Sequence, residues 1–120
     1  MVESIVRLTV SFSVTEAQMN AFKSIAAQMT DGTKAEPGTL GYEWFVSGDG
    51  MRFRLVETYV NAAAIEAHFM GSVVQQLVPK LASVSSVEGF EIYGDPGQKV
   101  AEMASAFGAS IYHYWIGINR

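Results

Sequence analysis

The fold is decided by the stretch Glu36-Pro37-Gly38-Thr39-Leu40-Gly41-Tyr42-Glu43 and by the residues that follow it as far as Phe69. Its Glu-Pro-Gly start predicts a tight turn. Alternating apolar and polar residues over 39–46 and 52–60, separated by turn residues at 47–50, predict a β-hairpin. Asn61 then precedes an alanine-rich run, which predicts a capped helix over 62–70. A turn, a hairpin and a helix start therefore lie in one continuous run.

Two further elements are predicted before this stretch. Residues 5–12 alternate as a half-buried strand. Thr15 followed by Gln18 is a capping-box pattern, which predicts the start of a helix. Apolar residues then recur at helical spacing, and Asp31-Gly32 predicts the end of that helix.

Two more elements are predicted after Gly71, which ends the short helix. Ser72 with Gln75 forms a second capping-box pattern and predicts a helix over 73–82, in which Pro79 marks a kink or an end. Residues 86–93 alternate as a fourth strand. The order βαββααβ predicts an α+β fold, a ferredoxin-like antiparallel sheet with helices on one face, in a single domain over 1–120.

Residues 95–120 add a helix and a strand to this pattern. Asp95-Pro96 predicts a helix over 96–107 that buries Val100, Met103, Ala104 and Phe107. The tail over 110–118 has the composition of a fifth strand and holds the densest aromatic cluster of the chain. We expect so apolar a tail to join a sheet edge or to cross to a partner subunit.

The composition excludes several classes of function. The net charge is −4 and no cluster of basic residues occurs, which argues against nucleic-acid binding. No apolar run is long enough to span a membrane. The chain has no cysteine, which excludes disulfides and thiolate chemistry and fits a reducing cytoplasm. Residues 1–4 lack a basic region before an apolar core, and therefore predict a strand and no signal peptide.

The balance of apolar and charged residues predicts an oligomer. Of the residues, 49% are hydrophobic and 17% are charged. A monomer of this size would leave apolar surface uncovered, and the second face of the predicted sheet carries mixed residues. We therefore expect a homodimer in which two sheets pack face to face.

His68 and Glu57 are the candidate catalytic residues. His68 borders the apolar face of its helix, where a neutral imidazole can act as a base or a hydrogen-bond donor. Glu57 shares a strand face with Phe53, Leu55 and Tyr59, so its pKa should be raised unless it is paired. The two side chains could form a base with an orienting partner. The alternative is a structural hydrogen bond that ties the strand to the helix.

Tyr42, Trp44 and Tyr59 are the candidate substrate-binding residues. They lie on the two strands of the hairpin and would line an aromatic slot if they share the helix-facing side. The alternative is that they are ordinary core residues. The sequence has no phosphate-binding loop, no nucleophile elbow, no flavin or nicotinamide fingerprint and no persuasive metal site, so no cofactor is expected.

The turn at Glu36-Pro37-Gly38, the strand ending in Glu57 and the helix carrying His68 together resemble the antibiotic biosynthesis monooxygenase family. The resemblance covers about residues 3–94. It implies a dimeric α+β barrel and, for members that are enzymes, oxidation of polycyclic phenols by oxygen without metal or flavin. Such enzymes use Asn, Trp, Tyr and Arg around the slot, and Trp44, Tyr59 and Arg54 are of the right types.

The resemblance also suggests alternatives. Some members degrade haem with a histidine on the second helix, where this chain has Leu77 and Val78 instead. The first hypothesis is therefore a cofactor-independent monooxygenase for a small flat aromatic or quinone-like molecule. A second is a non-catalytic dimeric small-molecule-binding or stress-response module of the same fold. A third is a structural domain whose pocket is filled by its own aromatic side chains.

Overall fold

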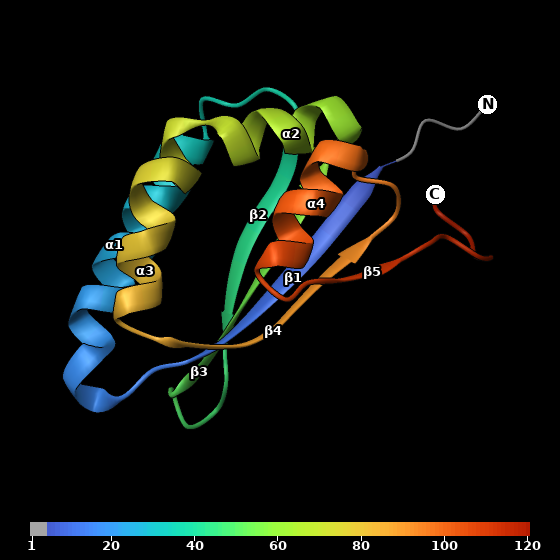
Figure 1. The fold of residues 1–120 in the computed structure, drawn as a ribbon. Helices are drawn as coiled ribbons and strands as arrows, with labels where there is room; N and C mark the ends of the chain where they lie inside the picture. Colours follow the sequence, from blue (N-terminus) through green and yellow to red (C-terminus); the bar gives the residue numbers. More distant parts are fainter. Residues whose placement is uncertain (1–4) are drawn as a thin grey trace.

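The computed structural model describes residues 5–120, so the strand predicted for residues 1–4 lies outside the described residues. Five strands and four α-helices are present, with one 3-10 turn and one π-helical turn (Figure 1). Their bounds are β1 (Val6–Ser13), η1 (Glu16–Gln18), α1 (Met19–Thr33), β2 (Thr39–Val46), β3 (Arg52–Tyr59), α2 (Ala62–Met70), η2 (Val73–Leu77), α3 (Val78–Ser83), β4 (Ser86–Tyr93), α4 (Gln98–Ala106) and β5 (Ser110–Tyr112).

The strands form a single sheet in the order β2-β3-β1-β4-β5. The first four are antiparallel to their neighbours, which confirms the predicted ferredoxin-like α+β fold. β5 runs parallel to β4, so the sheet is mixed and not antiparallel throughout. The direction of β5 follows from its connection, because a strand joined to its neighbour through a helix returns parallel to it.

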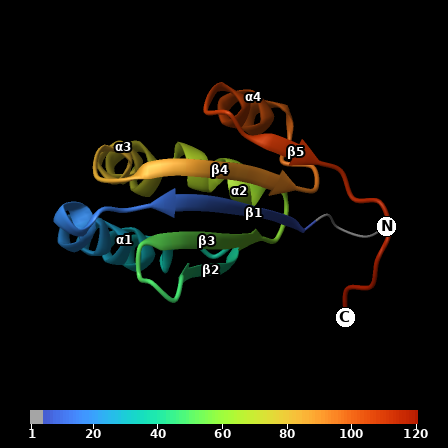
Figure 2. The same ribbon diagram turned by 90° about the horizontal axis from the view of Figure 1, so that it is seen from below.

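The helices α1, α2 and α3 cover one face of the sheet and leave the other face open. Figure 2 looks onto this open face, with the three helices behind the strands and α4 beside β5. Along β3, residues 53, 55, 57 and 59 are buried and the residues between them are more exposed. The period-2 alternation therefore gives the helix-facing side as predicted.

Two groups of buried apolar side chains make up the core. One joins α2 and α4 to the ends of β1, β3 and β4, and the other joins α1, η2 and α3 to the opposite ends of the strands. Val10 on β1 packs against both groups. Val10 and its neighbour Phe90 on β4 are only half-buried, so the helix layer is thinnest where the two groups meet.

The end of α1 differs from the prediction. The helix does not stop at Asp31-Gly32 but continues through Thr33, and Gly32 is helical. A Cβ atom at Gly32 would lie 2.7 Å from a methyl group of Val73. The glycine is therefore needed for the close approach of α1 to η2 and does not terminate the helix.

The predicted helix over 73–82 is divided into η2 and α3. Ser72 makes no capping hydrogen bond, and the Gln75 side chain donates instead to the carbonyl of Phe69 at 2.8 Å. Pro79 stands in the first turn of α3. Because proline lacks an N–H and its ring crowds the carbonyl four residues earlier, the preceding turn widens to a π-helix.

The C-terminal elements are shorter than predicted. α4 begins at Gln98, because Asp95 accepts the N–H of Gly97 and holds the chain outside the helix. Phe107 was expected to be buried, but it caps the helix and is 73% exposed. The fifth strand ends at Tyr112, so its prediction over 110–118 is right only for its first residues.

Candidate functional site

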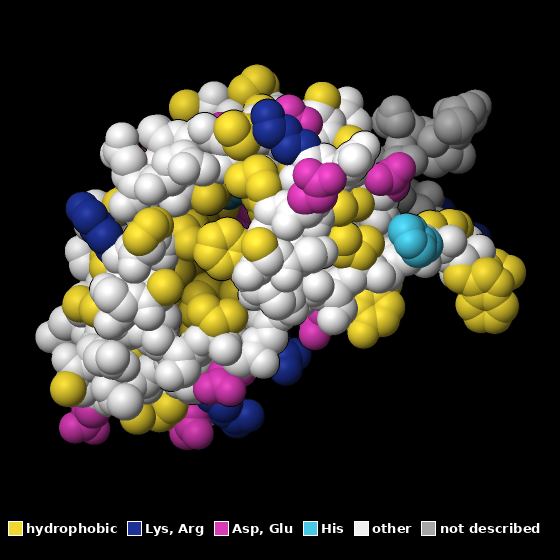
Figure 3. Space-filling model, in the orientation of Figure 1, with side chains coloured by type: hydrophobic (Ala, Val, Ile, Leu, Met, Phe, Trp, Pro, Cys, Tyr) yellow, Lys and Arg dark blue, Asp and Glu magenta, His cyan; other side chains and the backbone are white. Residues whose placement is uncertain are grey.

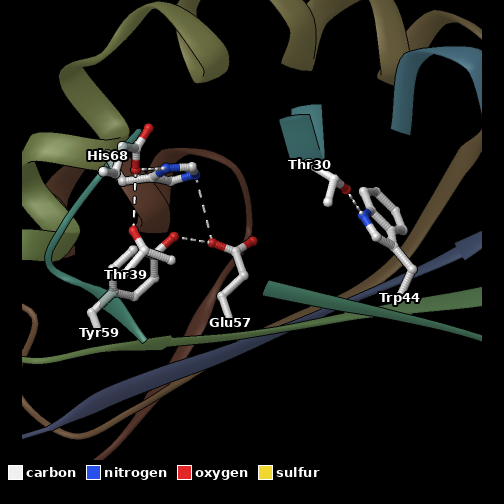
Figure 4. Close-up of polar contacts among 7 residues, drawn as sticks. Thr30, Thr39, Trp44, Glu57, Tyr59 and His68 are labelled. Carbon is white, nitrogen blue, oxygen red and sulfur yellow. Dashed lines mark hydrogen bonds and ion pairs between the residues drawn. The ribbon is translucent and has the colours of Figure 1, made fainter. Parts of the chain in front are cut away.

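His68 is held inside the protein by α2. The helix is capped by Asn61, whose side chain accepts the N–H of Ala64 at 2.9 Å. His68 lies in the last turn of the helix and is 2% exposed. Its Nδ1 atom is 2.6 Å from Oε1 of Glu36, which also accepts the hydroxyl of Thr39 at 3.2 Å (Figure 4).

This short contact defines the state of the imidazole. An ionised carboxylate only accepts hydrogen bonds, so Nδ1 carries a proton and donates it to Glu36. The second ring nitrogen, Nε2, points to Glu57 and lies 3.7 Å from its Oε1 atom (Figure 4). That distance is within reach of an ion pair but longer than a hydrogen bond. Nε2 is therefore the ring atom free to exchange a proton.

Glu57 lies on β3 beneath His68 and is almost fully buried. The Tyr59 hydroxyl donates a hydrogen bond to Oε1 of Glu57. Burial raises the pKa of the Glu57 carboxyl, and the charge of His68 and the bond from Tyr59 oppose that rise only in part. Burial and the neighbouring Glu57 also raise the pKa of Tyr59. Glu57 thus keeps its proton to higher pH than an exposed glutamate.

The predicted aromatic residues gather around His68. The ring of Tyr59 is 5.4 Å and the ring of Tyr42 is 5.7 Å from the imidazole, measured between centroids. Trp44 lies beyond Tyr42 at 6.2 Å, and its Nε1 donates to the Thr30 hydroxyl at 2.9 Å. Tyr42, Trp44 and Tyr59 therefore share the helix-facing side, as the slot hypothesis requires.

Tyr42 carries a buried hydroxyl beside this cluster. Burial, and to a lesser extent the charge of Glu57, raise the pKa of Tyr42. The Thr33 hydroxyl is close enough to counter part of this rise, yet neither hydroxyl makes a hydrogen bond of ordinary geometry. The polar groups next to His68 therefore include the buried hydroxyl of Tyr42, which has no hydrogen-bond partner.

Arg54 is not part of this cluster. It alternates with Leu55 and Glu57 along β3, so it lies exposed on the open face of the sheet. There it lines a hollow of ≈ 760 Å³ together with residues such as Ser11 and Phe45. The structure thus brings His68 together with Glu57 and the aromatic residues but places Arg54 on the other side of the sheet.

Glu36 is the site residue that the sequence analysis missed. It was interpreted only as the start of a turn, and Glu57 was expected to orient His68. In the structure Glu36 makes the hydrogen bond to His68, across 32 positions of sequence. The spacing of the two residues gives no signal for this contact. The contact becomes understandable from the pairing of the hairpin. Thr39 pairs with Tyr59, which places the turn that carries Glu36 next to the end of β3, where α2 follows.

An apolar hollow lies on the helix side of the sheet. Figure 3 shows a hollow between α3 and α4 with hydrophobic side chains along its walls. It lies over the division of the core, since α3 belongs to one apolar group and α4 to the other. On the sheet beneath, Val10 is the diagonal neighbour of Glu57, because Leu8 pairs with Glu57 and Val10 with Leu55. The strand beneath the hollow therefore lies beside Glu57, although the side chains of Glu57 and His68 are both buried.

Residues 5–120 include no group of three or more His, Cys, Asp or Glu side chains arranged to hold a metal ion. None of the helices in the same range has both the length and the apolar character needed to cross a membrane.

Comparison with known families identifies the first two thirds of the chain. The family model described as antibiotic biosynthesis monooxygenase matches residues 5–80. The matched segment contains Glu36, Glu57 and His68. No curated protein sequence matches the chain.

Solved structures share the fold. The crystal structure of MupZ from Pseudomonas fluorescens is 19% identical and covers 100% of this chain and 92% of its own, with a TM-score of 0.86. A protein from Shewanella oneidensis is 28% identical over 75% of this chain and 86% of its own, with a TM-score of 0.61. A structure described as an antibiotic biosynthesis monooxygenase is 17% identical over 72% of this chain and 92% of its own, with a TM-score of 0.64.

Proposed function

The chain belongs to the antibiotic biosynthesis monooxygenase family, and on this premise we propose that it is a monooxygenase acting on a small flat aromatic or quinone-like molecule without metal or flavin. One observation carries the proposal. A buried histidine is fixed by a carboxylate at Nδ1, while its Nε2 atom faces a second buried carboxyl group. This arrangement suits proton transfer in a site from which water is excluded.

The reaction begins with a proton transfer. An electron-rich phenol enters through the apolar hollow, and Nε2 of His68 removes its acidic proton. The positive charge that develops on the imidazole is stabilised by Glu36, which accepts the Nδ1 proton at 2.6 Å. Glu36 thus keeps the imidazole ring in one tautomer and one orientation. Catalytic bases are commonly oriented by a third group in this way.

Oxygen is the second substrate. The substrate anion transfers electrons to O₂, a C–O bond forms, and the resulting peroxide anion takes the proton held by His68 to give a hydroperoxide. The carbon that carries the peroxide then loses its hydrogen as a proton to His68 while the O–O bond breaks, which leaves a carbonyl group on the ring and releases hydroxide. One oxygen atom thus enters the product and the other becomes water. Glu57 fits the role of proton donor to the departing hydroxide, because burial raises the pKa of its carboxyl group. The substrate supplies all the electrons in this scheme.

The binding-module hypothesis keeps support from one observation. The Tyr59 hydroxyl and Glu57, and His68 and Glu36, satisfy one another within the core. A pocket that binds a ligand without catalysis could also be held rigid by hydrogen bonds of this kind. This alternative expects saturable ligand binding without any oxygen consumption.

Oxygen uptake with a set of tricyclic phenols tests the proposal, after a thermal-shift screen has selected a compound that raises the melting temperature. His68→Gln should lower the rate at least about 100-fold, since general-base catalysis contributes roughly 10² to 10⁴. His113→Gln is the matched control, because the only other histidine of the chain is exposed. Uptake that survives His68→Gln would show that His68 is not the base. Binding without uptake by the unaltered protein would favour the binding module.

A further inference from the structure

The turn that carries Glu36 meets α2 at two points. Glu36 contacts His68, since its Oε1 atom lies 2.6 Å from Nδ1 of the imidazole. Gly38 packs against Ala64, because a Cβ atom at position 38 would lie only 2.6 Å from the Cβ atom of Ala64. Ala64 and His68 are four positions apart in α2, so they lie on the same side of the helix, one turn apart. The backbone of the turn and its carboxylate therefore contact successive turns of one helix face.

Gly38 is required for space and not for its backbone conformation. Within residues 5–120 the positive φ angles belong to four other glycines, Gly50, Gly94, Gly97 and Gly108. A residue with a side chain could therefore adopt the backbone of position 38, and what excludes it is Ala64. Because carbon atoms in contact are normally about 3.5 to 4.0 Å apart, a methyl group at position 38 would force the turn and the helix apart by about 1 Å.

A displacement of Gly38 would also move Glu36. The two residues are joined through Pro37, whose ring fixes its own φ and restricts the backbone of the residue before it. The N–H of Thr39 donates to the carbonyl of Glu36 at 3.2 Å and closes the turn. The Thr39 hydroxyl donates to Oε1 of Glu36, also at 3.2 Å (Figure 4). These constraints leave the turn little freedom to absorb a movement at one of its residues.

A movement of this size decides whether Glu36 bonds to His68. The two atoms are 2.6 Å apart, and a further 1 Å would leave them about 3.6 Å apart, which is too long for a hydrogen bond. The contact determines which ring nitrogen carries the proton. Its loss would therefore release both the tautomer and the orientation of the imidazole.

We propose that Gly38 is a positioning residue, and that its contact with Ala64 sets the distance between Glu36 and His68. Gly38 has no side chain that could take part in chemistry, so it acts only through Glu36. Its effect on the rate rests on the proposed function, because only a reaction that uses His68 as its base would slow when the imidazole loses its orientation. Its effect on the imidazole itself is independent of any reaction.

Compensating substitutions test the proposal. Gly38→Ala introduces the methyl group that clashes, and Ala64→Gly removes the group with which it clashes and leaves the Cα atom of position 64 at 3.5 Å. The double variant should therefore restore the contact. Gly48→Ala is the matched control, because Gly48 also lies in a turn and a Cβ atom there would have no neighbour within 4 Å.

NMR of isotope-labelled histidine follows the proton of His68, and His68→Gln identifies its signals. The unaltered protein should show the tautomer protonated at Nδ1, with a proton that exchanges slowly with water. Gly38→Ala should speed this exchange at least about tenfold, because the proton loses its buried acceptor. It should also give a mixture of tautomers. The double variant and Gly48→Ala should both resemble the unaltered protein.

Two results would overturn the proposal. One is a Gly38→Ala variant that melts at a lower temperature but keeps the exchange rate and the tautomer of His68, since Gly38 would then have only a structural role. The other applies even where Gly38→Ala alone does not fold. The double variant is then compared with Ala64→Gly, and the methyl group at position 38 should leave the His68 signals unchanged in that background. Changed signals would contradict the proposal.

Oxygen uptake supplies a second readout. Gly38→Ala should lower kcat at least about tenfold and the double variant should recover to within about threefold, since a misplacement of about 1 Å can cost about 10² in rate. When Glu36 is already replaced by alanine, Gly38→Ala should cause no further loss. A further loss would show that Gly38 does not act through Glu36. If the unaltered protein consumes no oxygen, the proposed function fails, and the NMR result still decides the role of Gly38.

Discussion

Replacing Glu36 by alanine tests the central contact of the site. The substitution leaves the Nδ1–H group of His68 without its acceptor, in a side chain that is only 2% exposed. An unsatisfied buried donor destabilises a protein by about 1 to 3 kcal/mol. The Glu36 side chain is itself 25% exposed. Water can therefore replace part of the lost interaction, and we expect a loss near the middle of that range, about 2 kcal/mol.

The loss should be visible in thermal and urea denaturation. For a domain of this size, 1 kcal/mol corresponds to roughly 3 to 5 °C in Tm, so Glu36→Ala should lower Tm by about 6 to 10 °C. Glu43→Ala is the matched control, because Glu43 is exposed on β2. It should change the free energy of unfolding by less than about 0.5 kcal/mol.

A double-mutant cycle with His68→Phe separates this contact from other effects of the substitution. Once His68 is replaced by an apolar ring, no donor is left unpaired, and Glu36→Ala should then have little effect. The coupling energy should be about 1 to 2 kcal/mol. If Glu36→Ala melts within the error of the unaltered protein and the coupling is near zero, the contact is absent in solution. The assignment of the proton to Nδ1 would then have no basis.

Three further substitutions test other parts of the site. Because the pKa of Glu57 is raised above its ordinary 4.5, its contribution to stability is complete below that pH and is lost as the pH rises through the raised pKa. Glu57→Gln, which cannot ionise, should therefore gain in Tm relative to the unaltered protein as the pH increases from 4.5, and the exposed Glu16→Gln should not; a difference that is flat with pH would contradict the shift. Phe22→Ala removes a fully buried ring and should lower the free energy of unfolding in urea by about 3 to 5 kcal/mol, and a loss below 1 kcal/mol would show that the core near it is not packed as described. Trp44→Phe removes the hydrogen bond to Thr30 and should lower stability by about 1 kcal/mol, a loss that Thr30→Val should not add to.

Period-2 alternation was enough to predict which side of β3 faces the helices. Glu57 and Tyr59 were predicted to share a strand face with Phe53 and Leu55, and all four are buried on the helix-facing side. Because β3 runs directly into α2, the proximity of Glu57 to His68 was also predictable. These contacts are local in sequence and depend on secondary structure that a single strand and a single helix already define.

Arg54 shows what happens when residue type is given more weight than alternation. It was grouped with the slot because arginine occurs in the slots of related enzymes. The same alternation that buries Glu57 turns Arg54 to the opposite face, and the structure follows the alternation. A residue one position along a strand from a core residue cannot reach the same pocket.

The missed features depend on tertiary packing. Gly32 was interpreted as a helix terminator, because the sequence does not show that Val73 would lie 2.7 Å from its Cβ position. Pro79 was expected to kink or end a helix, and the π-helical turn before it is one way to relieve its ring. Phe107 follows the helical spacing of Val100 and Ala104, but α4 ends before it can turn inward. The predictions at Gly32 and Phe107 are therefore wrong, because they depend on a tertiary contact and on a helix end that the sequence pattern does not show.

Under the proposed function, chemistry and selectivity would depend on different segments of the chain. The polar side chains described around His68 lie between residues 33 and 68, at the end of α1, in the turn after it, in the β2–β3 hairpin and in α2. The apolar hollow is bounded by α3 and α4, which belong to later segments and to separate groups of core residues. Substitutions at the hollow can therefore change the shape of the entrance without altering the distances from His68 to Glu36 and Glu57. We accordingly expect residues of α3 and α4 to determine which flat molecule enters, and the contiguous hairpin and helix to determine what is done to it.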